Sequence, residues 1–178
     1  MPRSRGSRIC FLSAMALGAA VGLLGCGGIS GPTVLLTDLT LMPDQTGTLQ
    51  LKVFHLPSVR VVQVGPTGRL TFDPEVVRIE ALRPANGFEL FAHSVDNAAG
   101  EAVFLLAAPG GSLSTGTVLE IEVRAVGRVG SRSPVELTQI DLLADGAGAP
   151  ITAYALRPGR VSIGKERAPE FAFDSDLD

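Results

Sequence analysis

Residues 69–82 read RLTFDPEVVRIEAL and contain two short alternating segments joined by Asp73-Pro74. Leu70 and Phe72 share one face of an extended chain before the dipeptide, and apolar residues alternate again after it. Pro74 fixes φ at about −65°, and the side chain of Asp73 can accept a hydrogen bond from a backbone donor two residues on. Because proline also lacks a backbone N–H, the pair predicts a structural turn at which the chain crosses to another sheet.

The same alternation continues along the chain from residue 33. The clearest case is TVLEIEVRA (117–125), in which Glu120, Glu122 and Arg124 mark a solvent-facing side opposite an apolar face. EAVFLLA (101–107) is apolar on both faces and is typical of a central strand. Further segments of this kind are 48–53, 69–72, 76–82, 135–143 and 159–163.

Turn residues separate these segments, and no stretch after residue 32 has a sustained helical period with caps. About nine short strands predict an all-β chain whose residues 33–164 form a single β-sandwich with jelly-roll topology. A closed barrel is the alternative. Phe72 and Phe104 fall in the phase that faces the core.

Composition supports a folded domain and excludes one class of partner. The 178 residues are 46% hydrophobic and 19% charged, which is enough apolar surface for a core. The formal net charge of −3 offers no basic surface for nucleic acid.

The first 26 residues have the pattern of an export signal. Arg3, Arg5 and Arg8 precede an uncharged run from Ile9 to Leu24, which is short for a membrane-spanning anchor, the alternative. The run ends in LLGC and resembles the bacterial lipobox, in which the cysteine is lipidated and cleavage occurs just before it. We expect residues 1–25 to be a lipoprotein signal peptide, Cys26 to carry the lipid, and residues 26–32 to be a short tether.

This resemblance implies an exported protein held on a membrane of the cell envelope through its lipid. Residue 27 is Gly and not Asp, which favours the outer membrane if the host has one. At the other terminus, residues 165–178 (KERAPEFAFDSDLD) change composition and predict an acidic, disordered tail. The alternative is that Phe171 and Phe173 add to the fold as a strand or are recognised by a partner.

Catalysis finds little support in the sequence. His93, Ser94 and Asp96 could be imagined as a nucleophile set, but one short segment rarely supplies all three roles, and a polar loop is the preferred interpretation. The glycine-rich stretch 109–116 lacks the lysine and the helix of a phosphate loop, and predicts a surface loop. We therefore expect no enzyme.

Three clusters of acidic residues make calcium binding an alternative, and no other cofactor is expected. Calcium takes about 6–8 oxygen ligands, so each cluster would need help from other groups, and turn formation explains these residues more simply. The clusters are Asp96 with Asn97 and Glu101, Asp141 with Asp145, and Asp174 with Asp176 and Asp178.

Carbohydrate binding would require aromatic rings on the surface. Phe88, Phe91 and Tyr154 lie in loop-like or strand-end positions and are the candidates for stacking on a sugar. Three scattered rings do not form a platform from sequence alone, and such residues more often pack at edges.

The order of these segments resembles cohesin-like domains. RLTFDPEVVRIEAL is followed by VDNAAGEAVFLLAAP, by STGTVLEIEVRAVGRVGSRSPVELTQIDLLADGAGAPI and by GRVSI. In that family a strand carries a Tyr/Phe-Asp-Pro turn, and strands after an Asn-x-x-Gly turn, a Gly-Thr-Leu segment and a final Gly-x-Val-x-Val segment follow. The similarity spans about Pro43 to Ile163.

The resemblance implies a nine-stranded jelly-roll sandwich, related to some carbohydrate-binding modules, that binds dockerins or another protein partner. The family's dockerin contacts include an Asn/Asp pair, for which Gly65 and Thr67 stand here, so no contact residue is carried over. We expect a non-catalytic module that holds a protein partner in a surface assembly. The alternatives are polysaccharide binding and a structural role in an envelope secretion or pilus complex.

Overall fold

The structure, a computed structural model, describes residues 31–165, in which thirteen strands lie between Thr33 and Ile163. This range contains no helix, and therefore none long and apolar enough to cross a membrane. The predicted signal peptide, the predicted lipid site Cys26, most of the predicted tether and all but the first residue of the predicted acidic tail lie outside the described residues.

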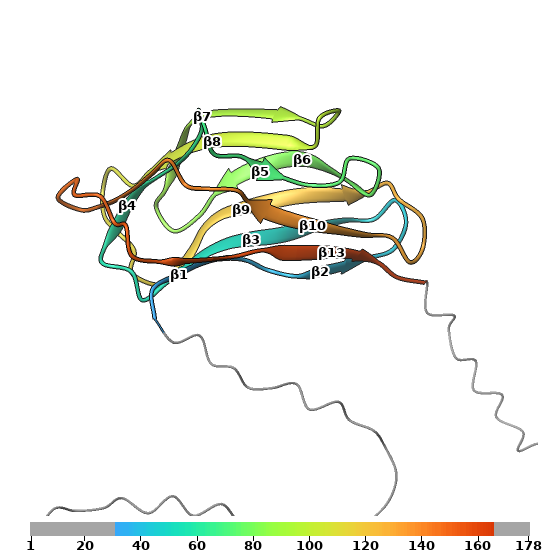
Figure 1. Ribbon diagram of the computed structural model, residues 1–178, viewed down its shortest axis with the longest axis horizontal. Coiled ribbons are helices and arrows are strands. Elements are labelled where there is room, and N and C mark those ends of the chain that lie inside the picture. Colours follow the sequence, from blue (N-terminus) through green and yellow to red (C-terminus); the bar gives the residue numbers. More distant parts are fainter. Residues whose placement is uncertain (1–30, 166–178) are drawn as a thin grey trace, which may run out of the picture.

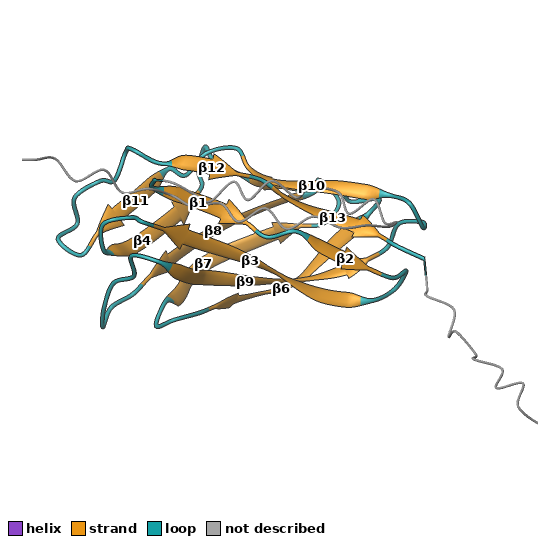
Figure 2. Cartoon of the chain, turned by 90° about the horizontal axis from the view of Figure 1, so that it is seen from below, coloured by secondary structure: helices purple, strands orange, loops and turns teal. Residues whose placement is uncertain are grey.

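The strands form two sheets (Figures 1 and 2). The five-stranded sheet has the order β12 (Ala155–Arg157), β1 (Thr33–Leu36), β3 (Thr46–Phe54), β9 (Gly116–Ala125) and β6 (Val77–Pro84). The eight-stranded sheet includes β11 (Leu142–Asp145), β4 (Val59–Val64), β8 (Glu101–Ala107), β5 (Leu70–Thr71), β10 (Arg132–Leu137), β13 (Gly159–Ile163), β2 (Leu39–Leu41) and β7 (Glu89–Asp96), which pairs with β8.

Strands β4 and β5 act as one interrupted strand. Both pair with β8 along the same edge, Val64 opposite Phe104 and Leu70 opposite Ala102. On their other side, β11 pairs with β4 and β10 pairs with β5. The larger sheet is therefore six strand positions wide, with β7 at one edge and β2 at the other.

The core lies between the two sheets and follows the predicted alternation. Phe72 and Phe104 are buried, as their phase predicts. Each fully buried leucine or isoleucine contributes about 1.5–3 kcal/mol relative to an exposed one, so this layer supplies the main stabilisation. The largest fully buried side chains include Leu49, Leu51, Leu119 and Ile121 from the five-stranded sheet and Val62, Val64, Leu70 and Leu106 from the other.

The Asp73-Pro74 turn carries the chain from one sheet to the other, as predicted. It connects β5 of the eight-stranded sheet to β6 of the five-stranded sheet. The Asp73 side chain accepts a hydrogen bond from the backbone N–H of Glu75 at 2.9 Å, and the Asp73 N–H donates to Ser133 Oγ at 2.9 Å. Gly100 must approach this turn closely, because its carbonyl accepts the Phe72 N–H at 2.9 Å.

The all-β sandwich is confirmed, while three local predictions are corrected. Thirteen strands replace about nine, because one expected segment is divided and several strands, namely β1, β2, β4, β7 and β12, lie outside the segments expected from alternation. The segment 135–143 is not one strand, since β10 ends at Leu137 and β11 begins at Leu142. Residues 93–96 are not a loop but belong to β7, in which seven of the eight residues pair with β8.

Candidate functional site

The outer face of the eight-stranded sheet carries an open groove of about 490 Å³, which we call the β8 groove. It lies over β8, between the edge strand β7 and the turn that joins β4 to β5. Val103 and Leu105 form an apolar floor, because they alternate along β8 with the buried Phe104 and Leu106. The walls include Ala92 and Ser94 from β7, and Gln63, Pro66 and Arg69 from the opposite side.

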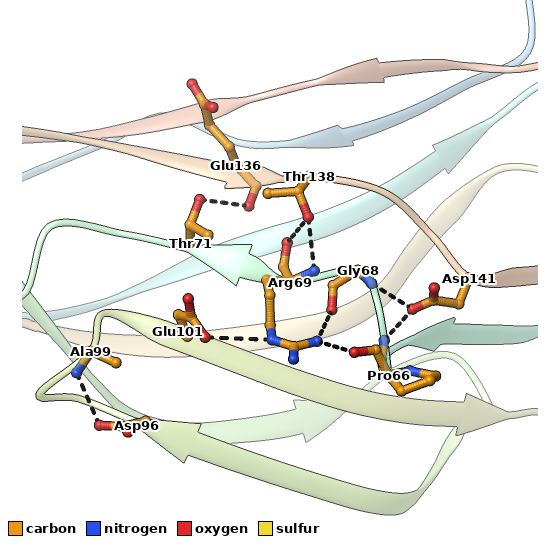
Figure 3. Close-up of polar contacts among 11 residues, drawn as sticks. Pro66, Gly68, Arg69, Thr71, Asp96, Ala99, Glu101, Glu136, Thr138 and Asp141 are labelled. Atoms are coloured by element: carbon orange, nitrogen blue, oxygen red, sulfur yellow. Dashed lines mark hydrogen bonds and ion pairs between the residues drawn. The ribbon is translucent and has the colours of Figure 1, made fainter.

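Arg69 is fixed across this face (Figure 3). Its Nη1 donates to the backbone carbonyls of Pro66 at 2.6 Å and Gly68 at 2.8 Å, and its Nε lies 3.4 Å from Glu101 Oε2. Its Nη2 has no partner among residues 31–165. Because the guanidinium is already held in place, a partner that accepts a hydrogen bond from Nη2 would cost little further side-chain conformational entropy.

The backbone of Arg69 is fixed as well. Its N–H donates to Thr138 Oγ1 at 2.9 Å, and the Thr138 N–H donates to the Arg69 carbonyl at 2.8 Å. These bonds continue the pairing of β5 with β10 past Leu137. The backbone that carries the Arg69 side chain is therefore held by the sheet.

Asp141 closes the turn at the side of the groove. Its Oδ2 accepts the backbone N–H groups of Gly65 at 2.5 Å and Gly68 at 2.8 Å, and its Oδ1 accepts from the side chains of Thr67 and Gln139. The hydrogen bond from Thr67, with those from Gln139, Gly68 and Gly65, holds the pKa of the Asp141 carboxyl well below its usual value of 3.8. The group is therefore a charged acceptor that shapes the turn.

Phe91 is the most exposed large apolar side chain in the described chain, at 58%. The pairing of β7 with β8 shifts register between Leu90 and Ala92, so Phe91 is the extra residue of a bulge. Bulges at sheet edges redirect a side chain and increase the local twist. This one exposes an aromatic ring on the edge strand that bounds the β8 groove.

Three acidic residues lie in one row across the sheet beside the groove, because Asp96 pairs with Glu101, Glu101 with Thr71, and Thr71 with Glu136. Asp96 ends β7, Glu101 begins β8 and Glu136 lies on β10, and all three residues are exposed (Figure 3). An apolar floor, a fixed arginine and charged residues beside them are features of a protein contact surface, in which large or rigid anchors lie next to polar residues.

The three aromatic candidates for sugar stacking do not gather. Phe88 is 5% exposed and packs in the core, so its predicted exposure is wrong: the turn at 85–88 folds its ring under the sheet. Tyr154 is half-buried before β12, and burial raises its pKa above 10.0. Phe91 lies on β7, at an edge of the other sheet, so Phe91 and Tyr154 do not form one platform.

Two of the three acidic clusters considered for calcium bind backbone groups, and the third, at residues 174–178, lies outside the described residues. Asp96 Oδ1 accepts the N–H groups of Ala98 and Ala99, and Asp145 Oδ1 accepts those of Ala147 and Ala149. Asn97 bonds both the N–H and the carbonyl of Ile79, which fastens the β7–β8 turn to β6. Within residues 31–165, no three acidic, histidine or cysteine side chains are placed to hold a metal ion.

The imagined nucleophile set is not assembled. Ser94 and Asp96 pair with the outward-facing Val103 and Glu101 of β8, whereas His93 pairs with the buried Phe104. Successive residues of a strand point to opposite faces, so His93 and Ser94 are not directed at one substrate. The predicted surface loop at 109–116 is confirmed apart from its last residue, which begins β9.

The charged set on β9 forms surface contacts on the opposite sheet. Glu122 lies 2.5 Å from Arg83 Nη2, and Arg124 lies 3.5 Å from Asp44. Exposed pairs of this kind contribute little to stability, about 0–1 kcal/mol each. They mark a polar face, as predicted, and contrast with the apolar floor of the β8 groove.

Sequence reasoning missed Arg69 and treated Asp141 only as a calcium candidate. The available signal was the stretch GPTG before RLTF, because two glycines around a proline place several backbone N–H groups close together. Such N–H groups need an acceptor, but nothing local to Gly65 indicates that it would be Asp141, 76 residues away.

Comparison with solved structures identifies the fold. No protein-family model matches the sequence, and no curated protein matches it. A chain in the crystal structure of a type I cohesin–dockerin complex from Clostridium thermocellum superposes with a TM-score of 0.63 at 12% identity, covering 75% of this chain and 99% of that one.

Two further cohesins give the same result. A non-cellulosomal cohesin from the archaeon Archaeoglobus fulgidus has a TM-score of 0.62 at 13% identity, covering 76% of this chain and 93% of its own. The seventh ScaB type I cohesin from Pseudobacteroides cellulosolvens has a TM-score of 0.63 at 8% identity, covering 78% and 96%. Together with the two-sheet architecture, these matches establish that the chain contains a domain with the jelly-roll fold of the cohesins.

Proposed function

We propose that this chain is a non-catalytic binding module whose β8 groove holds a dockerin-type protein partner. The observation that carries the proposal is the combination of an apolar floor, Val103 and Leu105, with an arginine that the protein has already fixed in place. Several cohesins of the same fold were solved in complex with dockerins, which supports a protein and not a small molecule as the ligand.

The recognition chemistry would differ from the pattern of the cellulose-degrading assemblies. Gly65 and Thr67 replace the polar pair of that pattern, and Asp141 already engages both residues. The polar anchor of this face is instead Arg69, beside Glu101. The partner would therefore bring an apolar surface for the floor and a hydrogen-bond acceptor for Arg69 Nη2, because an unpaired guanidinium buried at an interface is costly.

Lipid attachment at Cys26 would place this module on a membrane of the cell envelope. The sequence supports this part of the proposal, through the arginine-led apolar run that ends in LLGC. Acyl chains contribute about 0.8 kcal/mol per buried CH₂ group, so a multiply acylated cysteine anchors a protein stably. A short tether would then present the sandwich close to the membrane and leave the β8 groove free for a partner.

Titration calorimetry with a panel of calcium-loaded dockerin modules tests the proposal. We expect at least one to bind, and Leu105→Arg to abolish that binding by placing a charge on the floor. Thr48→Arg is the matched control, because Thr48 is exposed on β3 of the opposite sheet. The proposal fails if no dockerin binds, or if Thr48→Arg abolishes binding and Leu105→Arg does not.

A further inference from the structure

The end of the sandwich at which β13 finishes has a second, separate surface. It carries a groove of about 470 Å³ lined by Met42, Pro43, Asp44, Gln45 and Val129, which we call the end groove. Three of the five exposed large hydrophobic residues of the described chain lie at this end, namely Met42, Val126 and Val129, at 39%, 40% and 46% exposure. Exposed apolar side chains gathered in this way indicate a contact surface.

The chain leaves the sandwich at this groove. Gly164 donates its N–H to the carbonyl of Leu41 at 2.8 Å, and Gly130 donates its N–H to the carbonyl of Ile163 at 2.7 Å. The last described residues therefore lie between the β2–β3 turn, which holds Met42, and the β9–β10 turn, which holds Val129. Figure 1 shows these turns and the end of β13 at the same end of the molecule.

The residues that follow have matching chemistry. Residues 166–178 contain Phe171 and Phe173 on alternate positions, with five acidic residues and one arginine. Phe171 is six residues beyond Lys165, so its backbone can reach at most about 20 Å, which includes the groove at the exit point. A segment tethered beside its site binds at a high effective concentration, so a weak contact suffices.

Charge favours the same occupant. Arg128 and Arg132 are exposed at this end, in the hollow next to Val126, and neither has a carboxylate partner within residues 31–165. Asp174 and Asp176 directly follow the two phenylalanines. The apolar pair would thus meet Met42 and Val129, and the acids that follow it would meet the arginines of the neighbouring hollow. Asp44 in the groove and Asp73 and Glu75 in the hollow reduce that attraction.

We propose that residues 166–178 dock on the end groove, with Phe171 and Phe173 covering Met42 and Val129. Docking would remove exposed apolar surface from the end of the sandwich opposite the point where the tether enters, at Thr33. It would leave the β8 groove free, because the two grooves share no residue.

Paramagnetic broadening in nuclear magnetic resonance spectra tests this proposal. Residues 27–178 keep every described residue and contain no cysteine, so Ser175→Cys provides one site for a spin label. We expect strong broadening of the amide signals of Met42, Asp44, Gln45 and Val129. The double variant Phe171→Ser/Phe173→Ser should lose the part of this broadening that docking causes. The double variant Phe171→Leu/Phe173→Leu keeps apolar side chains and should show the broadening of the natural tail.

A tether effect alone gives a different result. A tail that only moves freely near its attachment point would broaden these signals equally with phenylalanine and with serine at both positions, and that outcome would overturn the proposal. Val129→Asp with the natural tail is the second variant, since it changes the groove and not the tail. Unchanged broadening in Val129→Asp would also overturn the proposal.

Discussion

The carboxylate of Asp141 accepts the backbone N–H of Gly68 at 2.8 Å and so ties the β10–β11 connection to the turn between β4 and β5. A Cβ atom on residue 68 would lie 2.3 Å from the Gln139 carbonyl, so only glycine fits this contact. Pro66 and Arg69, which line the β8 groove, belong to this turn, and the β10–β11 connection therefore holds them in position.

Acid should weaken this connection. Because the folded-state pKa of Asp141 is depressed, its contribution to stability is fully present above the unfolded-state pKa, about 3.9, and decreases as the pH falls below it. We expect Asp141→Asn to unfold at lower urea concentration than the wild type at neutral pH. The difference between the two midpoints should shrink as the pH falls below about 4. Asp38→Asn, an exposed position, is the control, and a pH-independent gap for Asp141→Asn would contradict this assignment.

Gly100 should be intolerant of a side chain. Its φ is +71°, and a Cβ atom there would lie 2.2 Å from the Phe72 carbonyl. We expect Gly100→Ala to lower the free energy of unfolding by about 2 kcal/mol or more, through backbone strain and displacement of the Asp73-Pro74 turn. Gly110→Ala is the matched control, because no atom lies within 4 Å of its added Cβ, and it should change stability by less than about 0.5 kcal/mol. Equal effects measured by urea unfolding would refute this account of the turn.

The Asp73 side chain should make a modest contribution. Asp73→Ala removes the acceptor for the Glu75 N–H, which is worth about 1 kcal/mol. For a domain of this size the melting temperature should fall by about 4 °C. Asp73→Asn keeps an acceptor oxygen and should recover most of the loss. A melting temperature unaffected by Asp73→Ala would show that Pro74 and the backbone bonds suffice for the turn.

Arg69 should matter more for binding than for folding. Arg69→Ala removes the fixed guanidinium from the β8 groove and should weaken partner binding by about 2 kcal/mol, as is typical of an arginine anchor. Arg69→Lys should not rescue binding, because an ammonium cannot reproduce the planar contacts to Pro66 and Gly68. Calorimetry and thermal unfolding, measured on the same variants, separate the two effects. Full affinity in Arg69→Ala would remove Arg69 from the proposed interface.

Lipid attachment gives a prediction about Cys26 alone. Cells that express the chain and are fed an alkyne analogue of palmitate should label the wild-type protein, and Cys26→Ser should abolish the label. Cys10→Ser is the control, because Cys10 lies in the predicted signal peptide. Undiminished label in Cys26→Ser would exclude the proposed anchor.

The sandwich was predictable because its signals are local. Alternation in 117–125 and the Asp73-Pro74 pair fix strands and a turn through residues that are neighbours in sequence. Strand β7 was missed because an edge strand with six exposed positions out of eight carries no apolar alternation. The division of 135–143 was missed because Thr138 and Asp141 turn the chain through bonds to Arg69, Gly65 and Gly68.

The candidate site was less predictable because it is assembled from distant segments. Its floor comes from residues 103–105, its fixed arginine from the residue that precedes β5 and its edge from β7, and no local pattern predicts that these segments lie side by side. Phe88 shows the same difficulty, since a phenylalanine in a turn is buried or exposed according to tertiary packing. Phe91 was singled out correctly as an exposed ring, but its place on a bulged edge strand follows only from the pairing with β8.

Hydrogen–deuterium exchange of the chain with and without a bound dockerin module tests the central claim most directly. The account predicts slower exchange on binding in β7, in β8 and in residues 65–69, which surround the β8 groove. It predicts unchanged exchange in β3 and β9 of the opposite sheet. Protection confined to β3 and β9, with none around the β8 groove, would contradict it.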